Sequence, residues 1–374
     1  MQEVEVRPPA PAAHARAHRA ARAAVLTPLA LFAALGCHTE ASLGHLAPAD
    51  IESSLFLIGD AGQQDPREVG APLDSLAMHA AVDPERAIIL FVGDNVYPEG
   101  IPEEGDAEWT DAVRRLRDQV RAVPPGARGI FIPGNQDWAG ETPFGLYSIR
   151  LQERLIEDLA DGRDVRLLPG NGCPGPVSIE NGRLRLVMLD TQWWLQEYVV
   201  RDEESDCDEN TGAVTAALRE HVRPTRTDQV VITAGHHPLM TGGAHGGYCG
   251  ISGPFRRFGN RAQDVISGPN RTLRDSIESA FSEHPPLVYA AGHEHNLQVL
   301  RGGENVDYLL VSGAGSHGKT ACGVRLRESY YVSQHRSGFM RVDILRGRGV
   351  LLRVYRYTGG GEGGLSYSRW LEPR

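Results

Sequence analysis

The stretch Gly93-Asp94-Asn95-Val96-Tyr97 is the segment that decides the fold of this chain. It follows the apolar run 87–92, which predicts a buried β-strand with charge on one side and glycine on the other. A carboxylate just beyond a buried strand lies where open α/β sheets bind their ligands, and Gly93 lets the backbone turn there. Asp94 has two oxygens and can join two cations, while a phenolate at Tyr97 suits a hard trivalent metal. A Gly-Asp-Asn turn alone more often satisfies only its own backbone, so further ligands have to come from elsewhere in the chain.

Four further segments repeat the pattern of an apolar run, a glycine and a residue that can bind metal. They are run 55–58 before Gly59-Asp60-Ala61-Gly62, run 129–132 before Gly134-Asn135-Gln136-Asp137, run 230–234 before Gly235-His236-His237-Pro238, and run 286–291 before Gly292-His293-Glu294-His295. Each segment is weak evidence, but five in one chain are improbable by chance. The pattern therefore predicts that side chains from separate strand ends converge on a pair of neighbouring cations.

In their order along the chain, these motifs resemble those of the calcineurin-like metallophosphoesterases. The Gly-Asp-x-Gly opening at Asp60 and the tyrosine at Tyr97 resemble the purple acid phosphatase branch, and within it the small, tartrate-resistant kind. Segments 292–298 and 312–315 are similar to the closing segments of that group. The resemblance covers about residues 54–358. It implies an α/β fold, a four-layer α/β/β/α sandwich of two mixed sheets flanked by helices.

The resemblance also implies a binuclear metal centre. Its ligands would be Asp60, Tyr97 and His295 on the first metal, Asn135, His236 and His293 on the second, and Asp94 bridging the two. In that branch the first metal is Fe³⁺ and the second is Fe²⁺, Zn²⁺ or Mn²⁺. Phenolate and carboxylates suit the trivalent ion, whereas two imidazoles and an amide oxygen suit the divalent one. His237 competes with its neighbour His236 for the ligand position.

One position departs from the family pattern. The third motif usually reads Gly-Asn-His, and here Gln136 replaces that histidine. Gln136 can donate a hydrogen bond but cannot carry a proton or a positive charge, and general acid help is typically worth roughly 10²–10⁴-fold in rate. His245 resembles a second active-site histidine of the small purple phosphatases and is the candidate substitute. The alternative is that His245 is an ordinary exposed loop histidine.

The function that this resemblance implies is hydrolysis of small phosphate monoesters by a hydroxide that bridges the metals, in the manner of an acid phosphatase. Two alternatives stay open: a phosphodiesterase or nucleotidase on the same metals, and a surface metal-binding module that has lost catalysis. The formal net charge of −10 argues against a nucleic-acid partner. We expect a monomer.

The first 36 residues differ in kind from the rest. Four arginines lead into the apolar run 23–36 and then Cys37, as in a secretory signal, and Ala34-Leu35-Gly36-Cys37 resembles a bacterial lipobox. We therefore expect a signal peptide over 1–36, a tether over 37–50 and one metallophosphoesterase domain over 51–374. The protein would be exported to the bacterial cell envelope and anchored in the membrane only through lipid on Cys37. Plain secretion and an unprocessed cytoplasmic protein are the alternatives.

Four cysteines remain after Cys37, and the sequence does not choose among their three pairings or exclude free thiols. Bridges within each half of the domain would join Cys173 to Cys207 and Cys249 to Cys322.

The Gly-rich loop 238–260 is a candidate rim or lid of the active site. Its Arg256 and Arg257 are either contacts to a substrate anion or solvated surface residues.

The remaining patterns concern helices, late strands and basic residues. Helical spacing predicts helices over 72–81, 108–123, 148–159 and 214–222, and alternation predicts antiparallel strands of a second sheet at 341–345 and 351–355. Trp193 and Trp194 would follow a strand and either bury a sheet edge or line a pocket. Lys319 is the only lysine, a bias that we attribute to genome composition.

Overall fold

The computed structural model describes residues 47–63, 71–196, 207, 210–247, 261–316, 318–319, 321, 328–347, 349–357 and 364–374. From Leu46 onward the chain forms one compact unit. The predicted signal peptide, Cys37, the Cys249–Cys322 bridge and the arginine pair Arg256 and Arg257 lie outside the described residues. Within them, no helix combines the length and the apolar character needed to cross a bilayer.

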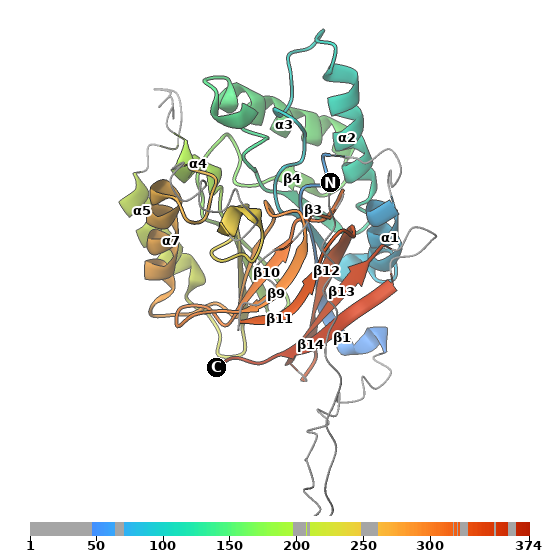
Figure 1. Cartoon of the computed structure of the whole chain (residues 1–374). Helices are drawn as coiled ribbons and strands as arrows, with labels where there is room; N and C mark the ends of the chain where they lie inside the picture. The colour runs from blue at the N-terminus through green and yellow to red at the C-terminus, as the bar shows by residue number, and fades with distance from the viewer. Residues whose placement is uncertain are drawn as a thin grey trace, which may run out of the picture. The chain divides into compact units, whose positions relative to one another are not determined.

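Two seven-stranded mixed sheets form the centre of this unit (Figure 1). The first sheet has the order β14 (Gly364–Leu371), β13 (Gly349–Arg356), β12 (Gly338–Leu345), β1 (Ile51–Ile58), β2 (Ala87–Phe91), β3 (Arg128–Phe131), β4 (Val165–Leu167). The second has the order β11 (Ser329–Ser333), β9 (Leu297–Arg301), β10 (Tyr308–Ser312), β8 (Val288–Ala291), β7 (Val230–Ala234), β6 (Leu184–Met188), β5 (Val177–Asn181). Strands β1 to β4 are parallel in the first sheet, as are β6, β7, β8 and β10 in the second.

Helices cover the outer face of each sheet, which gives the four layers that the resemblance implies. Against the first sheet pack α1 (Ala71–Ala80), α2 (Trp109–Arg121) and α3 (Gly145–Ala160); against the second pack α4 (Gln192–Leu195), α5 (Thr211–Val222) and α7 (Gly268–Phe281). Figure 1 shows α5 and α7 side by side, and α2 beside α3. The predicted sandwich is confirmed.

The strands read as unbroken apolar runs because both of their faces are buried. In β1, Leu55 and Leu57 enter the core between the sheets, while Phe56 and Ile58 meet the helices. In β6, Leu186 enters the same central core and Val187 faces α5 and α7. Strand periodicity thus assigns alternate residues to two different cores.

The observed helices contain most of each predicted range and extend it by a few residues at most. The prediction for β12 and β13 is half right. They are antiparallel, but they belong to the first sheet, because β12 pairs antiparallel with β1 through partners such as Leu57 and Met340. The chain therefore returns to its first sheet after the second is complete, and local alternation does not indicate which sheet a strand joins.

Two smaller predictions concern cysteines and tryptophans. Cys173 and Cys207 are joined with their Cα atoms 5.3 Å apart, which confirms the first of the expected bridges. Trp193 and Trp194 lie in the short helix α4 just after β6. Trp194 packs against the core of the second sheet and also lines the cavity described below.

Candidate metal centre

The predicted ligands lie at the carboxyl ends of parallel strands from both sheets. Asp60, Asp94 and Asn135 follow β1, β2 and β3, while His236 and His293 follow β7 and β8. The φ angles of Asp60, Asp94 and His293 are 57°, 56° and 66°, in the left-handed region that residues with a side chain rarely occupy. Such backbone strain concentrates at functional sites, and here it falls on three of the predicted ligands.

One half of the site surrounds the phenol of Tyr97. Its Oη lies 2.8 Å from Asp94 Oδ2, 2.9 Å from Asp60 Oδ1 and 3.0 Å from His295 Nε2. The Nε2 atom of His295 is in turn 3.3 Å from Asp60 Oδ1. The other oxygen of Asp60 accepts the backbone N–H of His293 at 2.8 Å. Two carboxylates, a phenol and an imidazole thus meet around one small space.

The other half gathers an amide oxygen and two imidazoles. Asn135 Oδ1 lies 3.0 Å from His293 Nδ1 and 3.2 Å from His236 Nε2, and these ring nitrogens are 3.2 Å apart. Asp94 Oδ1 is 3.3 Å from His236 Nε2. Asp94 therefore places one oxygen in each half, as a bridging ligand would.

Hydrogen bonds on the far side of each ring test whether a cation fits this second half. His236 Nδ1 lies 2.9 Å from the carbonyl of Val92, and His293 Nε2 lies 2.9 Å from the carbonyl of Gln263. Each of these nitrogens donates its proton to a carbonyl, so in the neutral rings His236 Nε2 and His293 Nδ1 carry lone pairs. Two lone pairs and the Asn135 oxygen then face one another with no proton to share. A cation among them relieves that repulsion, so the residues fit a metal.

The electrostatics of the half around Tyr97 also indicate that its residues fit a metal cation. Burial, and then the charge of Asp94, raise the pKa of Asp60 well above its usual range. Burial, followed by Asp60 and Asp94, likewise raises the pKa of Tyr97. In the second half, burial and the neighbouring histidines lower the pKa of His293, which keeps it neutral. Acidic groups packed this closely in the interior need positive charge, and metal cations supply it.

Glycine precedes these ligands because the loops approach one another too closely for a side chain. A Cβ on Gly93, whose φ is 88°, would contact Nδ1 of His236. A Cβ on Gly134 would contact both the backbone nitrogen and Oδ1 of Asp94. The repeated glycines are thus required by the convergence of the strand ends.

His237, the competing candidate, has other partners. Its Nδ1 lies 2.8 Å from Thr191 Oγ1 and its Nε2 lies 2.6 Å from Gln263 Oε1. Among the described residues, two groups place their ligand atoms within 4.8 Å of one another: Asp60, Asp94 and His236, and His236, His237 and His293. Because both nitrogens of His237 are engaged, the geometry favours His236 as the ligand, and this assignment stays a prediction.

Asp137 is a site residue to which the sequence analysis gave no role. Its Oδ1 accepts the backbone N–H groups of Asn95 at 2.9 Å and Val96 at 3.1 Å, and its Oδ2 accepts that of Gly134 at 2.8 Å. The side chain is completely buried. Asp137 therefore fixes the loops after β2 and β3 to each other. Its place in the Gly-Asn-Gln-Asp motif was the available signal.

The two predicted catalytic residues both line the cavity at the metal site. His245 stacks on His293 with ring centroids 4.1 Å apart, and its Nδ1 lies 3.0 Å from Asp264 Oδ1. Gln136 donates its backbone N–H to Asp94 Oδ1 at 2.9 Å. Nothing in the motifs pointed to Asp264, because its contact with His245 depends on how the loop after residue 260 folds back.

Glu294 connects the loop of His245 to the metal motif. Its Oε1 accepts the backbone N–H of Ala244 and its Oε2 that of His245, each at 3.0 Å. Glu294 is only 2% exposed and lies between the predicted ligands His293 and His295. The position of the His245 loop is therefore tied to that of the ligands.

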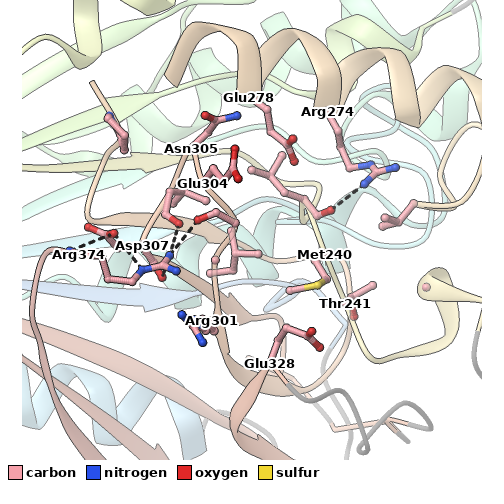
Figure 2. A pocket seen from close by; sticks show the side chains of 18 of the residues that line it. Met240, Thr241, Arg274, Glu278, Arg301, Glu304, Asn305, Asp307, Glu328 and Arg374 are labelled. Carbon is pink, nitrogen blue, oxygen red and sulfur yellow. Dashed lines mark hydrogen bonds and ion pairs between the residues drawn. The ribbon is translucent and has the colours of Figure 1, made fainter. Parts of the chain in front are cut away.

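The cavity above the predicted ligands has a volume of about 860 Å³. Asp94, Tyr97 and His293 line it, and so do the cations Arg261 and Lys319. A larger cavity, of about 1160 Å³, contains none of the predicted ligands (Figure 2). There, Arg374 pairs with Asp307 at 3.2 Å, and Arg274 donates to a carbonyl at 3.3 Å.

Two mixed sheets whose strand ends bring Asp, Asn, Tyr and His side chains to one paired site define a metallophosphoesterase fold. No family model matches the chain. Tartrate-resistant acid phosphatase type 5 of Rattus norvegicus is 22% identical to it over 276 residues, which is 68% of this chain and 71% of the relative.

Two solved structures are similar in fold. One is GAP50, the anchor in the inner membrane complex of Plasmodium, with a TM-score of 0.56 and 14% identity over 87% of this chain and 90% of its own. The other is purple acid phosphatase PPD1 from yellow lupin (Lupinus luteus), with a TM-score of 0.56 and 12% identity over 84% of this chain and 53% of its own. The chain is therefore similar to purple acid phosphatases, in sequence to the tartrate-resistant type and in fold to the lupin enzyme.

Proposed function

We propose that the protein hydrolyses small phosphate monoesters at a binuclear metal centre. The observation that carries the proposal is Asp94, whose two oxygens face the Tyr97 half and the His236 half of one site. Asp60, Tyr97 and His295 would hold one metal, and Asn135, His236 and His293 the other. When bound, such a pair would polarise the phosphoryl group and lower the pKa of a water molecule.

The chain's own residues supply orientation and charge. The carbonyls of Val92 and Gln263 fix the tautomers of His236 and His293, so the ligand nitrogens point into the site without reorganisation. Asp264 orients His245 beside His293, where its ring reaches the cavity. His245 would then assist the leaving group, the role that Gln136 cannot fill.

The phenol of Tyr97 is the ligand on which the proposed identity of the metals rests. A phenolate on a hard trivalent ion favours Fe³⁺ in the first position, with Fe²⁺, Zn²⁺ or Mn²⁺ in the second. We expect the purified protein to be coloured through charge transfer from Tyr97 to iron, and Tyr97→Phe to be colourless. The measurement is visible absorption with metal analysis of both proteins, and Tyr147→Phe, at an exposed tyrosine, is the control. A colourless wild type that contains only zinc and is fully active would contradict the iron assignment. It would remain compatible with a metallophosphatase.

A second candidate is a metal-binding module without catalysis. Gln136 favours it, because the family histidine is missing, and GAP50, which is similar in fold, is described as the anchor in the inner membrane complex of Plasmodium. Retained metals with no turnover would support it, provided that Gln136→His restores activity. Comparing hydrolysis of mono- and diesters separates the proposed monoesterase from a phosphodiesterase or nucleotidase.

Export and lipid attachment at Cys37 are part of the proposal and rest on the sequence pattern 1–37 alone. Cys37→Ser should release the protein from the membrane fraction of the host cell, as measured by fractionation and labelling with a radioactive fatty acid. Unchanged partition of the variant would remove the anchor.

A further inference from the structure

Lys319 is unusual both as a residue type in this chain and in its position in the structure. It is the only lysine among 38 basic residues. A bias of genome composition explains why lysine is rare, but it does not explain why the one lysine lines the cavity of the metal centre. The backbone N–H of Lys319 donates to the carbonyl of His295, which fixes this residue to the half of the site that contains Asp60 and Tyr97.

Arg261 approaches the same cavity from the other half. It lies two residues before Gln263, whose carbonyl binds the ring of His293. The two cations thus come from separate segments of the chain, and both line the cavity at the predicted metal pair.

Both residues are exposed, and among the described residues neither side chain has an ion pair or a hydrogen bond, although the charge of Lys319 interacts with that of Asp60. Two of the three arginines that line the larger cavity differ, since Arg374 and Arg274 are bound to protein oxygens there (Figure 2). An ammonium and a guanidinium that line a cavity and have no bonded acceptor among the described residues are suited to an anion, the ammonium as a compact charge and the guanidinium through paired hydrogen bonds.

We propose that Lys319 and Arg261 form an anion-binding pair that holds the substrate phosphate from the two sides of the metal centre. The inference rests on the proposed function, because it assigns the phosphate to that site. It also accounts for the uncharged Gln136. The positive charge that the family places in its third motif is supplied here by residues on the cavity walls.

The single lysine allows a direct test of contact. Reductive methylation with ¹³C-formaldehyde keeps the positive charge and labels only Lys319 and the N-terminal amine. In the metal-loaded protein, we expect titration with inorganic phosphate to shift the Lys319 resonance in a saturable manner. The N-terminal resonance serves as an internal control, and Lys319→Arg identifies the signal. A Lys319 resonance that stays fixed while phosphate saturates the enzyme would overturn the inference.

Kinetics test the contribution of each charge. We expect Lys319→Ala and Arg261→Ala each to raise KM for a phosphate monoester, and Ki for phosphate, about tenfold, as for loss of a charge-assisted hydrogen bond. Lys319→Arg should recover most of the affinity. Arg271→Ala is the matched control, because Arg271 is exposed on α7 and does not line the cavity. If Arg271→Ala has the same effect, the pair acts only through net charge and the inference fails.

The outcomes separate this inference from the proposed function. A saturable shift of the Lys319 resonance in a protein that hydrolyses no ester would support the anion-binding pair and contradict the proposed hydrolysis. Normal hydrolysis, with KM unchanged in both alanine variants, would contradict the anion-binding pair and support the proposed hydrolysis.

Discussion

Gln136 occupies the position where the family that the chain resembles has a histidine. Its backbone is fixed by the bond to Asp94 Oδ1 at 2.9 Å, so a histidine placed there keeps the same backbone anchor. We expect Gln136→His to raise kcat for alkyl phosphates, which need protonation of the leaving group, about 10²-fold, the lower end of what general acid catalysis typically gives. The rate for p-nitrophenyl phosphate, a good leaving group, should change little.

The control for this prediction is Gln136→Asn, which cannot transfer a proton. Equal gains on both substrates would indicate that the histidine acts by binding phosphate. No gain on either would show that His245 already provides the proton.

Asp190 makes stability depend on pH in an unusual direction. Burial raises its pKa to about 7, although Trp138 Nε1 donates to it at 2.7 Å and the backbone N–H of Trp193 at 3.1 Å. In the unfolded chain an aspartate has a pKa of about 3.9. The folded protein therefore loses stability as pH rises from about 4 to about 7, by up to roughly 1.4 kcal/mol per unit.

Asp190→Asn removes this dependence, so we expect the variant to gain stability relative to wild type between pH 5 and pH 7. Urea unfolding at several pH values measures the difference, with Asp228→Asn, at an exposed aspartate, as the control. A difference that is independent of pH would contradict the raised pKa.

At the scale of elements, the central strands were predictable and the sheet edges were not. Buried parallel strands are apolar throughout and end at glycine, so β1, β2, β3, β7 and β8 could be located with the ligands that follow them. The sheet that β12 joins is decided by pairing with β1, nearly 300 residues earlier in the chain, and no local pattern encodes that. Asp264 could not be predicted for the same reason. Asp137 and Glu294 stand in recognised motifs, but the sequence did not indicate which backbone groups they bind.

The loop that carries His245 depends on one carboxylate. Glu294 accepts two loop N–H groups, and a glutamine there can accept only through one oxygen and opposes the other N–H with its own donor. We expect Glu294→Gln to lower kcat about tenfold, with metal content unchanged, since partners outside the ligand set typically contribute 10- to 100-fold. Steady-state kinetics with metal analysis measures both quantities. Glu278→Gln, on α7, is the control, and loss of metal in Glu294→Gln would show that Glu294 supports the ligands themselves.

For the whole molecule, the site lies where the two sheets meet. Asp60, Asp94, Tyr97 and Asn135 come from the first sheet, and His236, His293 and His295 from the second. Hydrogen bonds also join segments of the two sheets at this edge. They include the bond from Gly59 N to the carbonyl of Ser312 at 2.8 Å and the contact of His236 Nδ1 with the carbonyl of Val92 at 2.9 Å. Bound metals would therefore crosslink the two halves of the fold.

Removing the metals should loosen both sheets together. Metal at a hundred times its Kd stabilises by about 2.7 kcal/mol, so we expect chelation to lower the melting temperature. The loss should grow as pH rises above the ordinary pKa of an aspartate, because Asp60 has a raised pKa in the metal-free protein and its ionisation there opposes folding. Hydrogen exchange measured by mass spectrometry should then accelerate in peptides 55–62 and 230–238 alike, with peptide 341–345 as the reference. Faster exchange in only one of the two would mean that the metals are held by one sheet and do not join them.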